Sequence, residues 1–536
     1  MNKIFLVLIS LFLFSCSYAQ QDEKSLRNQA VKYARVLNFV EEYYVDSVNL
    51  QLLTESAIKK VLSDLDPHSS YVSAEEVEKM NEMLEGSFEG IGITFNISND
   101  TLVVMSTISG GPSETVGLRA GDKILVVDEE EIAGVGLTNT KVFELLRGKK
   151  GTKVQLKVLR GSLAPMNFTV VRDKIPIYSL DASYMVDPHT GYIKLNRFGA
   201  QTVEEFEDAL ASLSKKNDLK HLILDLRGNG GGYLRAAIGI TNEYLSKDKM
   251  IVYTSGLHSP VKEYFSDSDG DFKKGRIVVL IDEGSASASE IVTGAIQDWD
   301  RGVVIGRRSF GKGLVQQPFM LTDGSLMRLT IAHYYTPAGR NIQKPYGKGT
   351  TAYYKDIYNR VEDGELFDST KVSRDSTSLF YTLKNRRRFY GGGGIVPDIY
   401  IPLDSTISYT YINRLIREDI FYPYVFDYLN QHRTEIIDAY PLFSVYKKEY
   451  KIDDAVIADL HKLAKEKIKD IKTVDDLESN KMISLQMKAI MARFIYPRGS
   501  FYEMLNEGDK EIEKALEILN NKKLYDDILS SPDTIF

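Results

Sequence analysis

The feature that most constrains this 536-residue chain is a run of small side chains at residues 284–290, Gly-Ser-Ala-Ser-Ala-Ser-Glu. An apolar, β-branched run at 277–281 precedes it, and apolar residues recur at helical spacing over 291–299. This order predicts a turn from a strand into a helix. Ser287 and Glu290 have the spacing of a capping box, which places the Ser287 hydroxyl at the helix N-terminus. Unpaired backbone N–H groups at such a position can hold an oxyanion.

Two roles for Ser287 stay open from these residues alone. A serine that precedes a helix is most often only a cap. Serines that alternate with alanines leave room for another backbone to approach, and Lys312 stands between Gly311 and Gly313, where a chain can pass close to its ammonium. A serine beside a lysine can act as a nucleophile with its general base.

Two segments, 284–316 and the Asp-Leu-Arg-Gly-Asn-Gly-Gly-Gly run at 225–232, resemble the carboxyl-terminal processing (tail-specific) proteases. That family consists of Ser/Lys serine peptidases with a PDZ domain. The resemblance implies that Ser287, the middle serine, is the nucleophile and that Lys312 is the base. It also implies that Gln316, one helical turn beyond Lys312, orients the lysine.

The glycine run at 228–232 begins a second predicted strand-to-helix turn. The resemblance implies that Gly231 and Gly232 offer backbone N–H groups beside that of Ala288, which together form an oxyanion hole. A phosphate-binding loop is the main alternative. The run lacks both the Gly-Lys-Ser/Thr ending of a P-loop and the spacing of a dinucleotide fingerprint. The whole resemblance extends over residues 37–402.

A small β-rich domain is predicted at 87–173. Its motif Gly90-Ile91-Gly92-Ile93 resembles the carboxylate-binding loop of PDZ domains, in which backbone N–H groups hold the terminal carboxylate of a peptide that pairs with a sheet edge. An ordinary β-turn is the alternative for such a short motif. Later segments that match PDZ strands in the same order favour the PDZ interpretation, which makes these four residues the expected substrate-binding loop.

The chain is too long for one ordinary core. With the resemblance, we expect a multidomain α+β protein: a crotonase-like α/β protease core, an inserted β-rich PDZ domain, and helical N- and C-terminal regions. The expected segments are a signal peptide at 1–19, an N-terminal helical region at 22–86, the PDZ domain at 87–173, the protease core at 174–404 with a polar insert at 345–390, and a C-terminal helical region at 405–536. The sequence does not indicate a role for the insert.

Apolar residues at helical spacing predict a helical arm at the start of the N-terminal region. Asp66-Pro67 must interrupt it, because a residue before proline is pushed out of the α region. His68 follows this break. A lone histidine beside a proline turn is more often structural than catalytic, so we expect a structural role.

The first residues have the pattern of a secretion signal: Lys3, an apolar run at 4–14, and a small-x-small site that predicts cleavage after Ala19. A lipoprotein is the alternative, because residues 13–16 imperfectly resemble a lipobox ending at Cys16. The bulky residue at position 14 counts against lipidation. The protein is therefore expected to be exported, periplasmic or in the cell envelope, and membrane-associated if Cys16 is lipidated.

Composition bears on three further questions: nucleic-acid binding, disulfides and metal sites. A formal net charge of −7 without a basic stripe argues against nucleic-acid binding. Cys16 is the only cysteine, so no disulfide is expected, and the scattered histidines form no metal motif. We predict no metal and no cofactor. The expected partners are protein substrates with free C-terminal tails, and the helical terminal regions could form a homodimer.

These observations predict an exported serine endopeptidase that captures C-terminal tails through its PDZ domain. The alternatives are a PDZ scaffold or chaperone without catalysis and a crotonase-type acyl-CoA enzyme. Intact Ser287, Lys312 and Gln316 oppose the first, and the predicted export signal opposes the second. A lysine base must be neutral, and lowering its pKa by about three units corresponds to roughly 4 kcal/mol of burial, so a dry, apolar surround is expected for Lys312.

Overall fold

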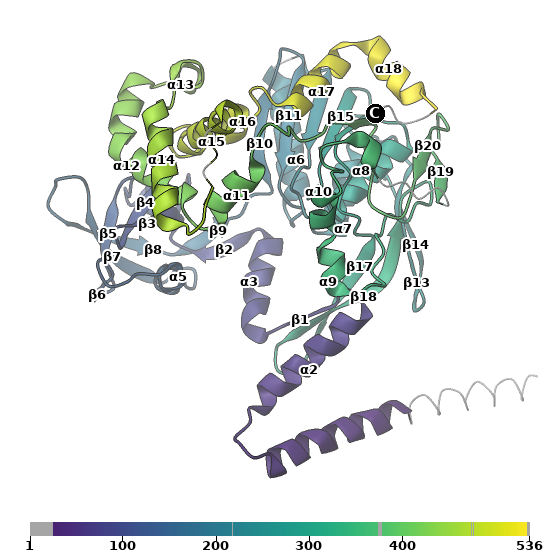
Figure 1. Cartoon of the computed structure of the whole chain (residues 1–536), viewed down its shortest axis with the longest axis horizontal. Coiled ribbons are helices and arrows are strands. Elements are labelled where there is room, and N and C mark those ends of the chain that lie inside the picture. The colour runs from purple at the N-terminus through teal and green to yellow at the C-terminus, as the bar shows by residue number, and fades with distance from the viewer. Residues whose placement is uncertain (1–24, 217, 373–377, 473, 475, 533–536) are drawn as a thin grey trace, which may run out of the picture.

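The computed structural model describes residues 25–532 apart from 217, 373–377, 473 and 475 (Figure 1). The predicted signal peptide and Cys16 lie outside the described residues. In the part of the chain that is described, no helix is long and apolar enough to cross a membrane.

A six-stranded sheet in the order β10-β11-β12-β15-β16-β21 forms the centre of the core. Its strands are β10 (Leu180–Met185), β11 (Thr190–Leu195), β12 (His221–Asp225), β15 (Arg276–Ile281), β16 (Val303–Gly306) and β21 (Ile399–Tyr400). The first pair is antiparallel and all later pairs are parallel. Parallel sheets are covered on both faces, which explains the unbroken apolar run in β15.

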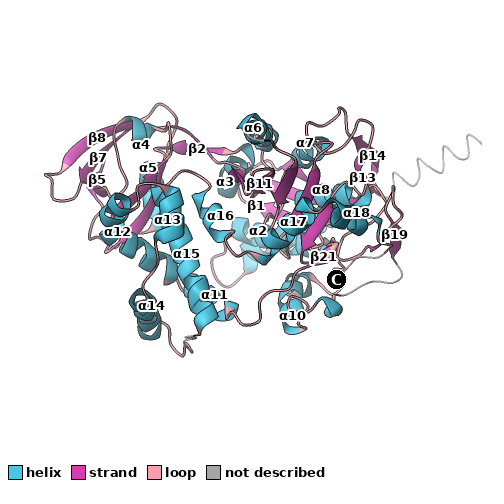
Figure 2. Cartoon of the chain, turned by 90° about the horizontal axis from the view of Figure 1, so that it is seen from above, coloured by secondary structure: helices cyan, strands magenta, loops and turns pink. Residues whose placement is uncertain are grey.

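Helices cover both faces of this sheet. Three of them, α6 (Thr202–Lys216), α7 (Leu234–Asn242) and α8 (Ala288–Asp298), pack on one face. The other face is covered by α17 (Lys510–Asn520) and α18 (Lys522–Ser530). Figure 2 shows these two beside the core strands and apart from the helices of residues 421–495. The region predicted at 405–536 is therefore divided in space, because its last two helices complete the core.

A second sheet joins the N-terminal arm to the core in the order β1-β18-β13-β14, with β17 paired to β18. Its strands are β1 (Ser70–Val72), β18 (Leu326–Tyr335), β13 (Met250–Gly256), β14 (Ser259–Phe265) and β17 (Leu314–Met320). Helix α2 (Leu50–Leu65) ends at the predicted break before Pro67. The chain then forms β1, in which Ser70 lies opposite Arg328 of β18. The regular elements of the N-terminal region, from residue 25 on, are thus helices and one strand that belongs to the second sheet.

The β-rich domain has the strand order β3-β4-β5-β7-β8, with β6 paired to β5. Its elements are β3 (Ile93–Ser98), β4 (Thr101–Thr107), α4 (Pro112–Thr115), β5 (Lys123–Val127), β6 (Glu130–Glu131), α5 (Asn139–Leu146), β7 (Lys153–Leu159) and β8 (Met166–Val171). The chain enters from α3 (Ala74–Glu85) through β2 (Ser87–Gly90) and leaves through β9 (Asp173–Pro176), which pairs with β2. Adjacent entry and exit strands are what an inserted domain requires.

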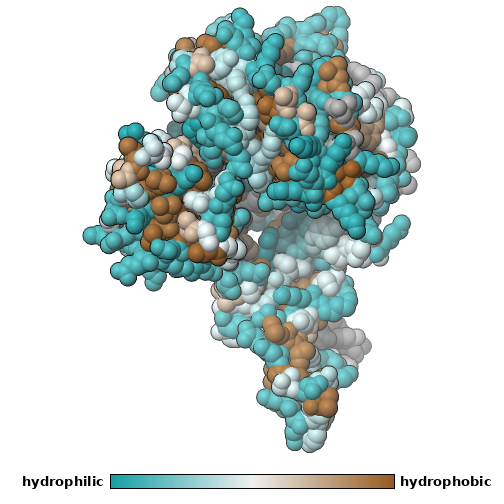
Figure 3. Space-filling view, turned by 60° about the vertical axis from the view of Figure 1, so that its left-hand side comes forward, coloured by the Kyte–Doolittle hydropathy of each residue, from teal (hydrophilic) through white to brown (hydrophobic). Residues whose placement is uncertain are grey.

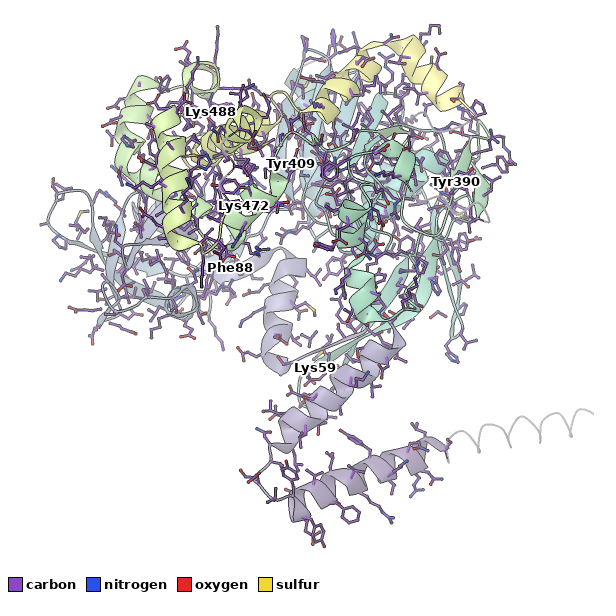
Figure 4. The ribbon with its side chains drawn as sticks, in the orientation of Figure 1. Lys59, Phe88, Tyr390, Tyr409, Lys472 and Lys488 are labelled. Carbon is purple, nitrogen blue, oxygen red and sulfur yellow. The ribbon has the colours of Figure 1, made fainter. Side chains whose placement is uncertain are left out.

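The C-terminal helices form a core of their own against this domain. They are α11 (Tyr409–Arg417), α12 (Phe421–Ala439), α13 (Phe443–Glu449), α14 (Asp454–Lys467), α15 (Leu477–Ile495) and α16 (Ser500–Leu505). In α12, Asp427 Oδ1 accepts a hydrogen bond from Ser98 Oγ at 2.5 Å, and Arg433 Nη2 donates one to the Met105 carbonyl at 3.2 Å. Figure 4 labels Tyr409, where these helices leave the core, and Lys488 within α15.

The insert predicted at 345–390 is folded onto the core. It contains α9 (Thr350–Tyr354), α10 (Asp356–Glu362), a 3₁₀ turn (Ser369–Lys371) and a hairpin of β19 (Leu379–Tyr381) and β20 (Arg388–Tyr390). Its buried charges are paired: Arg360 Nε lies 2.9 Å from Glu365, and Arg387 bonds Asp300 and Asp398 at 2.6 and 2.7 Å. Buried charges need such partners, which is why a polar sequence can pack here.

Candidate active site

Ser287 occupies a strained backbone position between β15 and α8. Its φ of 56° and ψ of −113° are rare for a residue with a side chain, and such strain is typical of functional sites. The neighbouring serines are buried and fasten the turn. Ser285 Oγ donates to the Leu226 carbonyl and Ser289 Oγ to the Asn229 carbonyl, each at 2.8 Å. Of the three serines, Ser287 lines the adjacent cavity.

The glycine run lies directly against this turn. A Cβ at Gly231 would stand 2.7 Å from the Ser287 Cβ, and one at Gly232 would stand 2.1 Å from the Phe198 carbonyl oxygen, so only glycine fits at either position. The Gly231 N–H donates to Asn229 Oδ1 at 2.9 Å. It is therefore engaged, which differs from its expected role as an oxyanion donor. Gly231, Gly232 and Ala288 all line the cavity.

Buried ion pairs fix the residue that precedes the glycine run. Arg227, which directly precedes it, pairs with Asp225 at 2.6 Å and with Asp509 at 2.7 Å, and it also bonds Glu511. Asp509 caps α17, and Glu511 lies in its first turn. Arg307 Nη1 donates to the same Glu511 carboxylate at 2.6 Å. The far end of the chain thus anchors the loop next to Ser287.

One buried carboxylate, Glu290, binds both predicted catalytic loops. Its Oε2 accepts the backbone N–H of Ser287 at 2.8 Å and of Lys312 at 2.9 Å. Its Oε1 accepts the Gly311 N–H at 2.7 Å and Ser309 Oγ at 2.5 Å. Burial raises the pKa of Glu290 to about 7, against the lowering effect of these hydrogen bonds. Four donors around two oxygens suit the ionised form, which only accepts.

Lys312 follows β16 in the loop that leads into β17, and it lines a cavity of about 520 Å³ that Ser287 also lines. Much of the lining is apolar: Met80, Leu84, Ile291, Leu314, Val315, Leu326 and Tyr334. Burial first, and then the charge of Arg328, lower the pKa of Lys312 to about 8, while Glu290 and Asp66 oppose this change. The apolar surround expected for a lysine base is present.

Gln316 lies on strand β17. The expected helical turn after Lys312 does not form in residues 314–320, which are extended. It stands opposite Thr330 of β18, just after an irregularity in the pairing at Val315. Gln316 Nε2 donates to Thr330 Oγ1 at 3.4 Å. A spacing of four residues is typical of a helical turn, but the chain is extended here because β17 pairs with β18 in the second sheet. Gln316 still lines the same cavity as Lys312.

Two residues of the N-terminal turn, Asp66 and His68, lie near Lys312, and sequence reasoning assigned neither to the site. Burial, followed by the charge of Lys312, lowers the pKa of His68 to about 4, so its ring is neutral near pH 7. His68 Nε2 lies 2.8 Å from the Tyr353 hydroxyl of α9. The only sequence signal was the Asp-Pro helix break, and it does not reveal what the turn contacts.

Tyr353 of the insert supports the lysine loop through Gln343 and Lys344, which directly precede the insert. The Gly313 N–H donates to Gln343 Oε1 at 2.8 Å, and Gln343 Nε2 lies 3.3 Å from the Tyr353 hydroxyl. The Lys344 ammonium stands 3.8 Å from the centre of the Phe310 ring. These contacts give the insert a role that the sequence did not reveal.

The predicted substrate-binding loop, Gly90-Ile91-Gly92-Ile93, joins β2 to β3. Gly92 has φ 73°, and Ile91 is buried in the domain core. β3 pairs with β4 alone among the described strands, which leaves one edge of β3 unpaired beside the loop. Across this edge, the Phe95 ring of β3 contacts the Phe143 ring of α5 at 5.5 Å.

No cluster of three or more His, Cys, Asp or Glu side chains suited to a metal ion occurs within the described residues. The cavity brings together the Ser287 hydroxyl, the Lys312 amine of lowered pKa, and the start of helix α8 at Ala288.

Comparison with known proteins gives three family matches along the chain. Peptidase family S41 matches residues 189–352, a PDZ domain matches 90–170, and a family of unknown function matches 411–497. The last match falls on the helices that pack against β3 and β4.

Named relatives span most of the chain. It is 37% identical over 400 residues to the carboxy-terminal-processing protease of Bartonella bacilliformis, covering 74% of this chain and 89% of the relative. It is 34% identical over 366 residues to the carboxy-terminal processing protease CtpB of Bacillus subtilis, covering 67% and 75%. Among solved structures, the photosystem II D1 C-terminal processing protease is 25% identical with a TM-score of 0.35, covering 69% of this chain and 92% of that one.

A PDZ domain of a carboxy-terminal protease from Vibrio cholerae, solved with a peptide, is 36% identical with a TM-score of 0.16. It covers 17% of this chain and 97% of that one. The peptidase and PDZ matches fall on the core and the β-rich domain, respectively. The match to the Bartonella protein is long and similar enough to place the chain in the same family. The chain belongs to peptidase family S41 and is a C-terminal processing serine protease with a PDZ domain.

Proposed function

We propose that Ser287 is the nucleophile and Lys312 the general base of an exported endopeptidase that takes its substrates by their C-terminal tails. The observation that carries the catalytic assignment is the Glu290 carboxylate, which holds the backbone of Ser287 and of Lys312 at 2.8 and 2.9 Å. A shared acceptor fixes two loops that are distant in sequence, and acyl transfer needs its groups held in place.

In this mechanism Ser287 Oγ attacks the scissile carbonyl carbon while neutral Lys312 accepts the hydroxyl proton. The backbone N–H groups of Ala288 and Gly232 stabilise the oxyanion. Lys312 then protonates the leaving amine, and water hydrolyses the acyl-enzyme with Lys312 again as the base. Gln316, held by Thr330, orients the lysine from the cavity wall.

Tail recognition by the PDZ domain is supported by the edge of β3. An extended peptide can add a strand to an unpaired edge, and inward backbone N–H groups at the adjoining loop can hold its terminal carboxylate. The apolar residues Ile91, Ile93 and Phe95 belong to the domain core beside this edge. They favour apolar final residues in the bound tail.

Export and dimer formation are further parts of the proposal. The signal-peptide pattern of the first residues supports export. For the dimer, Figure 3 shows hydrophobic side chains on the projecting N-terminal arm. The helical residues 25–43 expose large apolar groups, with Phe39 60% and Tyr43 71% accessible. A second copy of the chain is the partner that we propose for this arm.

The three serines give the first test. Ser287→Ala should reduce cleavage of an unfolded protein to the background rate without loss of thermal stability, because it removes only the nucleophilic oxygen. Ser285→Ala and Ser289→Ala should keep activity and lose roughly 1 kcal/mol of stability, since each removes one buried hydrogen bond. An active Ser287→Ala enzyme beside an inactive Ser285→Ala enzyme would assign the nucleophile to Ser285.

The protonation state of Lys312 gives the second test. Burial lowers its pKa to about 8, so the neutral base forms as pH rises through that value, and kcat/KM should rise with it. Lys312→Arg should be as inactive as Lys312→Ala, because a guanidinium stays protonated. Initial rates between pH 6 and 10 measure both effects. Substantial turnover by the arginine variant would show that another group is the base.

A paired-peptide competition tests the PDZ assignment. A peptide with a free, apolar C-terminus should inhibit cleavage of a protein substrate better than the same peptide ending in an amide. Only the carboxylate offers two anionic oxygens to the loop that contains Gly90 and Gly92. Equal inhibition by the two forms would contradict tail recognition by the PDZ domain and would not bear on the Ser/Lys chemistry.

A further inference from the structure

The turn after α2 is built around a buried carboxylate that lies beside the proposed base. Asp66 Oδ1 accepts the backbone N–H of His68 at 2.7 Å and of Ser69 at 2.8 Å. Asp66 Oδ2 accepts Ser69 Oγ at 2.6 Å. An aspartate that binds the N–H groups following it is the usual way to close a tight turn. Its side chain therefore has a fixed direction.

The same carboxylate reaches the second sheet through Thr330. Thr330 Oγ1 donates to Asp66 Oδ1 at 3.0 Å, and the Thr330 N–H donates to Ser69 Oγ at 3.0 Å. The pairing of β1 with β18 holds the turn at this place. Closing a turn would need only local bonds. The additional bond to Thr330 directs the carboxylate toward the proposed catalytic groups.

The Thr330 hydroxyl connects Asp66 to Gln316. Because its hydrogen is donated to Asp66, its lone pairs remain to accept Gln316 Nε2 at 3.4 Å on the neighbouring strand. The resulting chain of donors runs from Gln316 through Thr330 to Asp66. Gln316 and Lys312 line one cavity, so the chain ends beside the proposed base.

Asp66 also belongs to the set of charges around Lys312. Burial would raise the pKa of Asp66, but hydrogen bonds from Ser69, His68 and Thr330 outweigh burial and hold it below its usual value. The negative charges of Glu290 and Asp66 favour the Lys312 ammonium, and Arg328 disfavours it. His68, which also faces Lys312, is neutral near pH 7.

We propose that Asp66 is a positioning residue of this protease. It fixes the Gln316 amide through Thr330, and its negative charge offsets the effect of the Arg328 charge on the Lys312 ammonium. The N-terminal arm would then complete the catalytic site in addition to leading into the PDZ domain. This inference rests on the proposed roles of Lys312 and Gln316.

The hydrogen-bond chain is tested with two substitutions at one position. Thr330→Val keeps the side-chain volume but breaks the link between Gln316 and Asp66, and kcat should fall roughly 10-fold with little change in KM, as expected when a catalytic group loses its orientation. Thr330→Ser retains the hydroxyl and should recover most of this loss. Wild-type kcat in a folded Thr330→Val enzyme would overturn the chain.

The charge is tested with Asp66→Asn, which keeps an acceptor oxygen for Thr330 and removes the negative charge. Without that charge the Lys312 ammonium is less stable, so the acidic limb of kcat/KM should move to lower pH than in the wild type. A role confined to closing the turn would lower the thermal midpoint and leave the limb in place, which would overturn the proposal. Rapid turnover by Lys312→Arg would instead overturn the assignment of the base, so the two failures are distinguishable.

Discussion

The relative position of the Ser287 turn and the Lys312 loop depends on the buried Glu290 carboxylate. The turn that contains Ser287 and the loop that contains Lys312 come from different parts of the core, and each has a backbone N–H that binds Glu290 Oε2. A buried carboxylate is unfavourable unless its oxygens are satisfied, and four donors satisfy them here. The requirement that stabilises Glu290 therefore also sets the relative position of Ser287 and Lys312.

The surrounding elements extend the same arrangement. Arg227 ties the glycine run to α17, which packs on the far face of the central sheet. Gln343 and Tyr353 hold the lysine loop from the insert side. Segments distant in sequence thus hold the loops that line one cavity. The ion pairs of Arg227 with Asp509 and Glu511 link α17 to the core.

The local parts of this account follow from the sequence. The apolar run of β15, the small residues at 284–290 and the capping-box spacing of Ser287 all act within a few residues, so their structure is predicted correctly. A spacing of four suits a helix, but residues two and four apart also share a side of an extended chain, so Gln316 was misassigned to a helical turn. The pairing of β17 with β18 makes this segment a strand, and the sequence does not reveal that pairing because it depends on tertiary contacts.

The missed features share one physical cause. Asp66 acts through Thr330, and the buried Arg387 through Asp300 and Asp398, across long stretches of sequence. Paired charges inside a protein look like a solvated loop in the sequence alone, which is why the insert was described only as polar. The sequence likewise shows that α17 and α18 have apolar faces, but it does not show which sheet these faces cover.

The most direct measurement of the central claim is the kcat of Glu290→Gln, with exposed Glu263→Gln as the control. Glutamine has one acceptor oxygen and a donating amide. If its oxygen replaces Oε2, its amide faces the Gly311 N–H, and if its oxygen replaces Oε1, its amide faces the N–H groups of Ser287 and Lys312, so at least one backbone donor is opposed in either orientation. The account predicts that a folded Glu290→Gln enzyme loses roughly 100-fold in kcat through misplacement of its catalytic groups. A folded variant with wild-type kcat would contradict the claim that this carboxylate aligns Ser287 with Lys312.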